Sequence, residues 1–241
     1  MSDLLRSVIN AHGGTNRWQE VGAIDVTFNF WGALLDLKGF PGHFLPIASI
    51  DAHTPRTTFL HLDRESENRW IFTPDRVWIE RPDGSVVAER NQPRAAFAGH
   101  VRETPWDELH LTYFAGYAVW NYLTIPFIFS EPGFSTRELE PHTENGETWR
   151  RLEVTHPDHF PTHTKVQTFY FGEDFLLRRM DYVADVVSGV AAHYTYDMKT
   201  VEGITFPHFR RVVRRSPDGR ALISGPTSFV LDYTQLHIRN R

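Results

Sequence analysis

The hydrophobic residues of the chain follow two different periods, and the period predicts where helices and strands lie. Near the N-terminus, apolar residues from Leu4 to Ile9 recur at helical spacing, which predicts a helix over residues 3–12. Further on, from Ile24 to Phe30, apolar residues alternate with polar or small ones. That period of two is typical of a half-buried strand.

Most of the remaining chain repeats the strand pattern. Short alternating runs are separated by turn residues, such as Pro82-Asp83-Gly84 and Asn145-Gly146. Because no long helices separate these runs, the sheet should be antiparallel. A sheet this long tends to curl. We therefore expect a mainly antiparallel β (α+β) fold, a curled half-barrel of about ten strands, forming one domain over residues 1–241.

One stretch breaks this pattern. From Leu109 to Phe129 the chain carries no Asp, Glu, Lys or Arg, and aromatic residues cover most of the helical circumference. A helix that is apolar almost all round is buried in a protein core or in a membrane. The stretch is long enough to span a bilayer, but it contains polar residues and no Lys or Arg cluster flanks it. We therefore predict a core helix gripped by the sheet, and no transmembrane segment.

The flanking residues predict the limits of this central helix at 105–124. Thr104 is a candidate N-cap, Pro105 suits the first helical position, and Asp107 completes a capping box. Pro126 disfavours helical backbone at the residue before it, so the helix should end there.

The composition limits the compartment and the chemistry. The chain of 241 residues has no cysteine, which excludes disulfides, thiolate catalysis and lipid attachment through an N-terminal Cys. Its N-terminus lacks the basic and apolar regions of a secretory signal. We therefore expect a cytoplasmic protein.

The charge pattern and the glycine motifs narrow the partners. The net charge of −5 is spread along the chain, and the basic cluster at residues 210–215 would be divided between two strand faces. Nucleic acid is therefore not an expected partner. There is no Walker A loop and no G-x-G-x-x-G motif, so we expect neither ATP nor a dinucleotide, and no other cofactor.

Two motifs and the order of elements carry a family resemblance. The segment Val201–Pro207, VEGITFP, and the curled sheet with one aromatic helix resemble the lipoprotein-localisation-factor superfold of LolA/LolB-like carriers and related mycobacterial lipoproteins. More closely, the AHGG-x3-W element at Ala11–Trp18 and the aromatic helix resemble cytoplasmic actinobacterial proteins of unknown function. The superfold resemblance implies an incomplete barrel that holds lipid in an apolar cavity. Without a signal peptide or a lipidation Cys, it does not extend to lipoprotein shuttling.

The aromatic helix and the first strand are expected to line this cavity. Aromatic residues make up 14% of the chain, which suits an apolar interior or a ligand cavity. The ligand we expect is a hydrophobic or aromatic small molecule or an acyl chain. The predicted ligand contacts are Phe28, Phe30, Tyr113, Tyr117, Trp120 and Asn121.

The central helix also carries candidate catalytic residues. His110, Tyr113, Tyr117 and Asn121 recur at helical spacing and form one polar stripe. Asp107 lies one turn before His110 and can set its tautomer. The stripe either hydrogen-bonds to the sheet as a structural feature or faces the cavity, where the His–Asp unit would transfer protons.

A second candidate lies on a predicted strand. In the sequence His193-Tyr194-Thr195-Tyr196-Asp197, a period of two places His193 and Asp197 on one face and the tyrosines on the other. If the tyrosine face packs in the core, the His/Asp face is exposed to water. If His193 and Asp197 instead face a cavity, they are a candidate acid–base pair.

Three histidines in the loop THPDHFPTHT form the last candidate. The spacing of His156, His159 and His163 suits zinc, but no helical HExxH motif accompanies it, and exposed loop histidines are common. We therefore predict no metal site. His163 resembles a recurrent position in the actinobacterial proteins and is our catalytic candidate from this loop.

Three functions remain open from the sequence. The first is a carrier that binds a hydrophobic ligand in the half-barrel. The second is an enzyme in the same cavity, a cofactor-independent isomerase, cyclase or lyase, or less favourably a metal-dependent one. The third is an interaction module with a filled barrel. Convergence of His110, His163 and His193 on one pocket would favour the enzyme.

Overall fold

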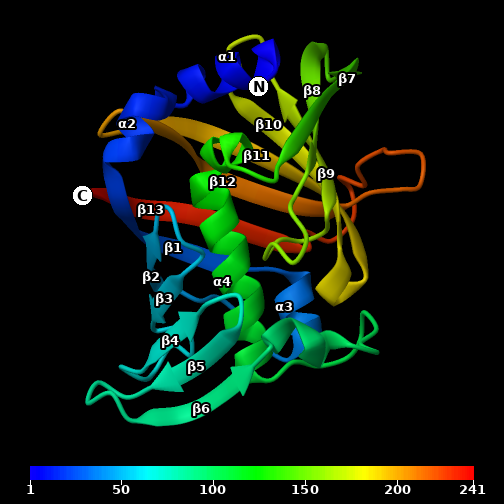
Figure 1. Ribbon diagram of the computed structural model, residues 1–241. Helices are drawn as coiled ribbons and strands as arrows, with labels where there is room; N and C mark the ends of the chain where they lie inside the picture. Colours follow the sequence, from blue (N-terminus) through cyan, green and yellow to red (C-terminus); the bar gives the residue numbers. More distant parts are fainter.

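One antiparallel sheet of 13 strands runs through the protein in the computed structural model, which describes residues 1–241 (Figure 1). This confirms the curled antiparallel fold, with 13 strands where about ten were expected. The strands are β1 (Val21–Trp31), β2 (Ile47–Asp51), β3 (Thr57–Leu60), β4 (Arg69–Phe72), β5 (Arg76–Glu80), β6 (Val86–Asn91), β7 (Ser135–Glu144), β8 (Glu147–Thr155), β9 (Val166–Phe171), β10 (Leu177–Ala184), β11 (Gly189–Val201), β12 (Ile204–Arg214) and β13 (Phe229–Asn240).

The strand order shows how two series of hairpins become one surface. The order is β6-β5-β4-β3-β2-β1-β13-β12-β11-β10-β9-β8-β7, so the first and last strands lie together in the middle, and β6 and β7 form the edges. Along the β1–β13 ladder, Ile24 lies opposite Ile238 and Val26 opposite Leu236. This apolar ladder joins the two series, and all other neighbours in the sheet are consecutive in sequence.

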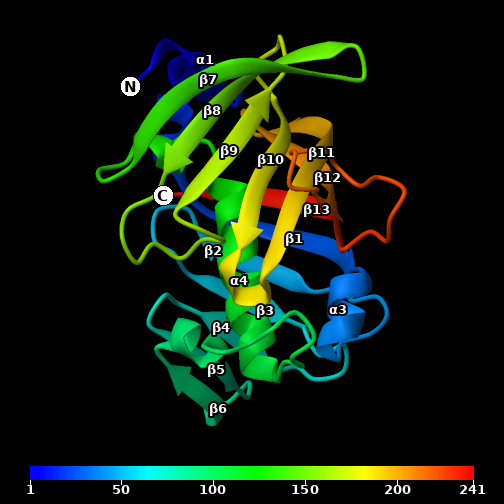
Figure 2. The same ribbon diagram turned by 90° about the vertical axis from the view of Figure 1, so that its right-hand side faces the viewer.

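The helix α4 (Glu108–Thr124) lies in the hollow of the curled sheet (Figures 1 and 2). Every residue from Leu109 to Thr124 is buried, as an apolar circumference requires. None of the helices combines the length and the apolar content that crossing a membrane requires. The core-helix interpretation of this stretch is therefore confirmed.

The start of α4 differs from the prediction. The N-cap is Asp107, whose side chain accepts a hydrogen bond from the backbone N–H of His110 at 2.8 Å. Thr104 and Pro105 lie before the helix. The backbone N–H of Trp106 donates to the carbonyl of Lys38 at 3.0 Å, and this contact holds the segment against the end of the helix Ala33–Lys38. The helix ends at Thr124, before Ile125 and Pro126.

One side of α4 packs very closely on the sheet. A Cβ atom at Gly116 would overlap the Cβ and Cγ atoms of Phe72 on β4. Beside this contact, the hydroxyl of Thr57 on β3 donates to the Gly116 carbonyl at 2.9 Å. Glycine at this position therefore lets the helix backbone approach β3 and β4 more closely than any side chain would allow.

The N-terminal helices α1 (Asp3–Ala11) and α2 (Gly14–Glu20) surround the AHGG element. α1 ends one residue before the predicted limit, with His12 as its C-cap. Gly13 has a φ of 127°, and a Cβ there would overlap the carbonyl of Gly203. The His12 carbonyl accepts from Thr205 N at 3.0 Å. The AHGG element thus packs on the β11–β12 turn that belongs to the VEGITFP segment.

The short helix α3 (Ala33–Lys38) was not predicted from the sequence. It ends in Lys38, whose side chain is fully buried. The Lys38 ammonium donates to the carbonyls of Arg102 at 2.7 Å and Thr104 at 2.9 Å. This lysine therefore ties α3 to the loop that precedes α4.

Candidate functional site

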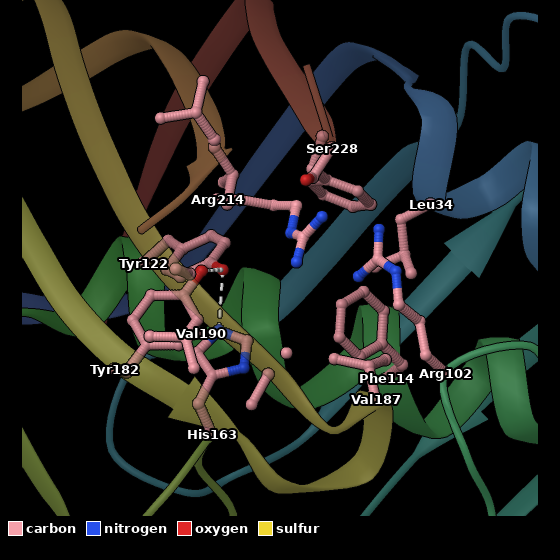
Figure 3. A pocket seen from close by; sticks show the side chains of 16 residues that line it. Leu34, Arg102, Phe114, Tyr122, His163, Tyr182, Val187, Val190, Arg214 and Ser228 are labelled. Carbon is pink, nitrogen blue, oxygen red and sulfur yellow. Dashed lines mark hydrogen bonds between the residues drawn. The ribbon is translucent and has the colours of Figure 1, made fainter. Parts of the chain in front are cut away.

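An apolar pocket lies between α4, α3 and the strands β10–β13 (Figure 3). Phe114 and Tyr122, two turns apart on α4, line it together with Leu34 of α3. The cavity volume is about 40 Å³. The remaining lining residues are Arg102, His163, Tyr182, Ala184, Val187, Gly189, Val190, Ala191, Val212, Val213, Arg214, Ser228 and Phe229.

A buried histidine lies at the floor of this pocket. His163 comes from the loop between β8 and β9, and both of its ring nitrogens are hydrogen-bonded. Nδ1 lies 3.0 Å from the Tyr117 hydroxyl, and Nε2 lies 2.8 Å from the Tyr122 hydroxyl. The imidazole also stacks on the ring of Tyr182, with centroids 4.0 Å apart. His163 thereby connects α4 to the sheet.

The hydrogen-bonded chain continues across three strands of the concave face. Tyr182 lies on β10, His193 on β11 and Arg210 on β12, each diagonal to the next in the strand register. The Tyr182 hydroxyl lies 3.5 Å from that of Tyr122 and 3.2 Å from His193 Nδ1. Arg210 lies 3.5 Å from His193 Nε2 and donates to the Tyr122 carbonyl at 2.8 Å. The chain therefore returns to α4.

Arg210 sets the direction of this chain, because a guanidinium can only donate. His193 Nε2 is then an acceptor, so His193 carries its proton on Nδ1 and donates to Tyr182. Tyr182 donates in turn to Tyr122, and Tyr122 donates to Nε2 of His163. His163 is left with its proton on Nδ1, directed at the Tyr117 hydroxyl.

Burial keeps the imidazoles and phenols of the chain neutral. It lowers the pKa of His163 to about 3, with the positive charge of Arg94 as a second cause. The pKa of His193 is also lowered, by burial and by Arg210. Burial raises the pKa of both Tyr117 and Tyr122. With both His163 nitrogens engaged, its imidazole has no lone pair left for a metal or a substrate in this arrangement.

The predicted His110–Asp107 pair is present, but at another place. His110 Nδ1 lies 2.7 Å from an Asp107 carboxylate oxygen at the start of α4, and Arg90 pairs with the same carboxylate at 2.6 Å. The pKa of Asp107 is lowered to about 2: burial opposes the shift, and the hydrogen bonds from the Arg90 guanidinium and the His110 backbone N–H outweigh it. His110 packs against Phe97 rather than the pocket. It therefore does not converge with His163 and His193.

The predicted pairing of His193 with Asp197 is wrong. Asp197 has a φ of 54°, a backbone conformation that departs from the extended strand on which the period of two depends. Its exposed carboxylate pairs with Lys199 at 2.7 Å. His193 faces the hollow of the sheet and is fully buried, whereas Tyr194 packs in a small cluster on the outer face.

The loop histidines do not converge either. His156 is buried and its Nδ1 donates to the Lys165 carbonyl at 3.0 Å, while His159 is exposed. No three His, Asp or Glu side chains of the protein lie together in a way that would hold a metal ion. The three loop histidines are therefore not arranged as zinc ligands.

None of the predicted ligand contacts lines the apolar pocket. Phe28 and Phe30 are buried on β1, and Phe30 packs edge-to-face on the pocket residue Phe229 at 4.4 Å. Asn121 donates to the carbonyl of Pro161 at 2.7 Å. Tyr113 packs on Phe72 and Phe97, and Tyr117 reaches His163.

Trp120 lines a different cleft, with a volume of about 290 Å³. Trp18, Phe134 and Phe160 share this cleft with three prolines. The Trp120 indole N–H donates to the carbonyl of Asp51 at 2.7 Å. Among the residues named from the sequence, only His163 lines the apolar pocket.

Comparison with known proteins gives the fold. No protein-family model matches the chain, and no curated protein does. Among solved structures, a putative outer membrane lipoprotein-sorting protein domain from Vibrio parahaemolyticus aligns over 98% of this chain and 91% of its own, with a TM-score of 0.56 and 10% identity. A LolA superfamily protein from Nitrosomonas europaea aligns over 98% and 93%, with a TM-score of 0.54 and 9% identity. The chain has a LolA-like fold.

A third similar structure, a DUF1329 family protein from Desulfovibrio piger, covers 98% of this chain and 94% of its own, with a TM-score of 0.50 and 12% identity. The predicted LolA-like superfold is therefore confirmed over nearly the whole chain. The resemblance to actinobacterial proteins stays a prediction. In this LolA-like protein, the apolar pocket lies where the sheet curls around the central helix (Figure 3).

Proposed function

We propose that the protein binds a hydrophobic small molecule or an acyl chain in the pocket between α3, α4 and β10–β13. The observation that carries this proposal is the pocket itself, an almost wholly apolar space on the concave face beside α4. Buried apolar space is the usual feature of small-molecule sites. The similar Vibrio structure is described as a lipoprotein-sorting domain, which agrees with a hydrophobic ligand.

Binding requires the pocket to widen. Its volume of about 40 Å³ admits only a few atoms, whereas ligand pockets usually measure about 300–1,000 Å³. Two short elements bound the pocket, α3 and the turn η3 (Asp185–Val187). Glycines flank α3 at Gly32 and Gly39, both with positive φ. We infer that these two elements move apart when the ligand enters.

A pair of matched substitutions tests the proposal. Ala191 lines the pocket and is buried on the concave face of β11, whereas Val166 on β9 is exposed and lies outside the pocket. Tryptophan at position 191 would fill the pocket, and tryptophan at 166 would not. We expect native mass spectrometry to show one dodecanol per native chain and per Val166→Trp chain, and strongly reduced uptake by Ala191→Trp. Equal uptake by both variants would place the ligand elsewhere.

The enzyme alternative uses the same pocket, and one observation favours it. His163, Tyr122 and Tyr182 line the pocket and belong to one hydrogen-bonded chain. Its groups are already paired with one another, which favours a structural role for the chain over acid–base chemistry. A molecule that co-purifies and changes mass on incubation with the protein would indicate the enzyme. Failure of native protein to bind any apolar ligand would instead favour the interaction module with a filled barrel.

A further inference from the structure

Two arginines lie at the mouth of the apolar pocket. Arg102 belongs to the loop before α4, and Arg214 is the last residue of β12. Arg102 is half-buried and Arg214 is exposed. Figure 3 shows their guanidinium groups directed toward each other above the apolar walls. Two positive charges therefore lie at the entrance of a space that is otherwise uncharged.

Neither guanidinium has an anionic partner. Nearby arginines do: Arg94 pairs with Asp185 at 2.9 Å, and Arg90 pairs with Asp107 at 2.6 Å. Arg102 and Arg214 make no ion pair and no side-chain hydrogen bond. The protein has 30 acidic residues against 25 basic ones, so a shortage of carboxylates does not explain two unpaired arginines at one place.

The fold holds both arginines at this entrance. The carbonyl of Arg102 accepts from the buried Lys38 ammonium at 2.7 Å, which fixes the loop beside α3. Arg214 lies opposite Ala191, itself a pocket residue, in the β11–β12 ladder. Two separate parts of the chain therefore present a guanidinium to the same opening.

We propose that the ligand of this pocket is an amphiphile with an oxyanion head group, a carboxylate or a phosphate, which Arg102 and Arg214 bind while its apolar body enters the pocket. This inference rests on the proposed function. A guanidinium matches both head groups with parallel hydrogen bonds, and the apolar walls beside it weaken the competition from water. The head group binds at the mouth and not at the floor, because the hydrogen bonds of the floor residues are made to one another.

Three ligands of equal chain length test the head group. Dodecanoate, dodecyl phosphate and dodecanol are titrated into the full chain by calorimetry, below the concentrations at which they form micelles. We expect at least one of the two anions to bind native protein about tenfold more tightly than the alcohol, as a charge-assisted hydrogen bond implies. The tighter anion identifies the head group. High ionic strength should weaken anion binding and leave alcohol binding unchanged.

Three arginine-to-glutamine variants show which arginines bind the head group. Arg102→Gln and Arg214→Gln should each bring the affinity for the anion close to that for dodecanol, with dodecanol binding unchanged. Arg220→Gln is the matched control, because Arg220 has no ion pair and lies in a cleft on the outer face of the sheet. Thermal unfolding of each variant shows whether it is folded. If Arg102→Gln is unstable, the result with Arg214→Gln decides, because Arg214 is exposed.

The outcomes separate this inference from the proposed function. If all three ligands bind with equal affinity, or if the arginine variants bind the anion as native protein does, the head-group proposal is wrong and hydrophobic binding stands. If none of the ligands binds native protein, the proposed function fails as well. Loss of anion binding in Arg220→Gln alone would assign the anion to the outer cleft and overturn the proposal.

Discussion

The two sides of α4 contact the sheet in different ways. Toward β3 and β4, Gly116 brings the helix backbone onto Phe72, and no space remains between helix and sheet. Toward β10–β12, aromatic side chains and a chain of hydrogen bonds fill a wider gap, and the apolar pocket lies within it. The first side fixes the helix in place. The second side is held by contacts between side chains and not by close approach of the backbone, and the empty space beside the helix lies there.

The largest expected effect on stability comes from disrupting the close packing of α4 on β4. Gly116→Ala places a methyl group on Phe72, and overpacking of a core usually destabilises by about 1–3 kcal/mol, occasionally more. We expect about 3 kcal/mol from urea unfolding, since the overlapping atoms are adjacent to backbone on both elements. The gain in helix propensity, about 1 kcal/mol, offsets only part of it. The double variant Gly116→Ala/Phe72→Ala should lose less stability than the sum of the two single variants.

The second prediction concerns the hydrogen-bonded side of α4, toward β10–β12, and the pH dependence of the protein's stability. Burial holds the pKa of His163 at about 3 in the folded protein, against 6.5 ordinarily. The unfolded chain therefore binds the extra proton first, and this contribution to stability is complete above pH 6.5 and lost as the pH falls toward 3. Stability should fall by about 1.4 kcal/mol per pH unit from this histidine well inside that window. His12 and His156, each with a pKa lowered to about 4 by burial, add to the slope.

A histidine substitution separates these contributions. His163→Phe is less stable at neutral pH, because the Tyr117 and Tyr122 hydroxyls lose their partner, but its stability should vary less with pH than that of native protein. His237→Gln is the control, since its exposed side chain on β13 removes no buried imidazole. An unchanged slope in His163→Phe, measured by urea unfolding between pH 4 and 6.5, would mean that His163 is not a buried neutral imidazole.

The smallest expected effect comes from the hydrogen bond between β3 and α4. Thr57→Val removes the hydroxyl that donates to the Gly116 carbonyl at 2.9 Å and keeps the shape of the side chain. One hydrogen bond contributes about 1 kcal/mol, so the variant should lose about that much in urea unfolding. A loss as large as that of Gly116→Ala would show that the hydrogen bond, and not close packing, holds this side of the helix.

The sequence predicted the elements well where the signal is local. The uncharged run identified α4, and Pro126 placed its end correctly. Its start was wrong because Thr104 and Asp107 are both good N-caps, and a contact with Lys38, distant in sequence, decides between them. The helix α3 was missed because six residues show too little of a period to be recognised.

The site was harder to predict because it is assembled across the fold. His163 was named from its loop, but its partners lie on α4 and on three strands, and only the register brings Tyr182, His193 and Arg210 into one line. Spacing along one element cannot show this. The same holds for Arg102 and Arg214, which come from separate parts of the chain and meet only at the mouth of the pocket.

The buried Lys38 gives the protein an internal reporter. The sequence has two other lysines, Lys165 and Lys199, and their side chains are 57% and 53% exposed. A small amine-acetylating reagent will modify these two at once, whereas Lys38 reacts only in molecules where α3 has separated from the Arg102 loop. The rate of its acetylation, followed peptide by peptide, therefore measures how often α3 separates from the Arg102 loop, with the two exposed lysines as internal references.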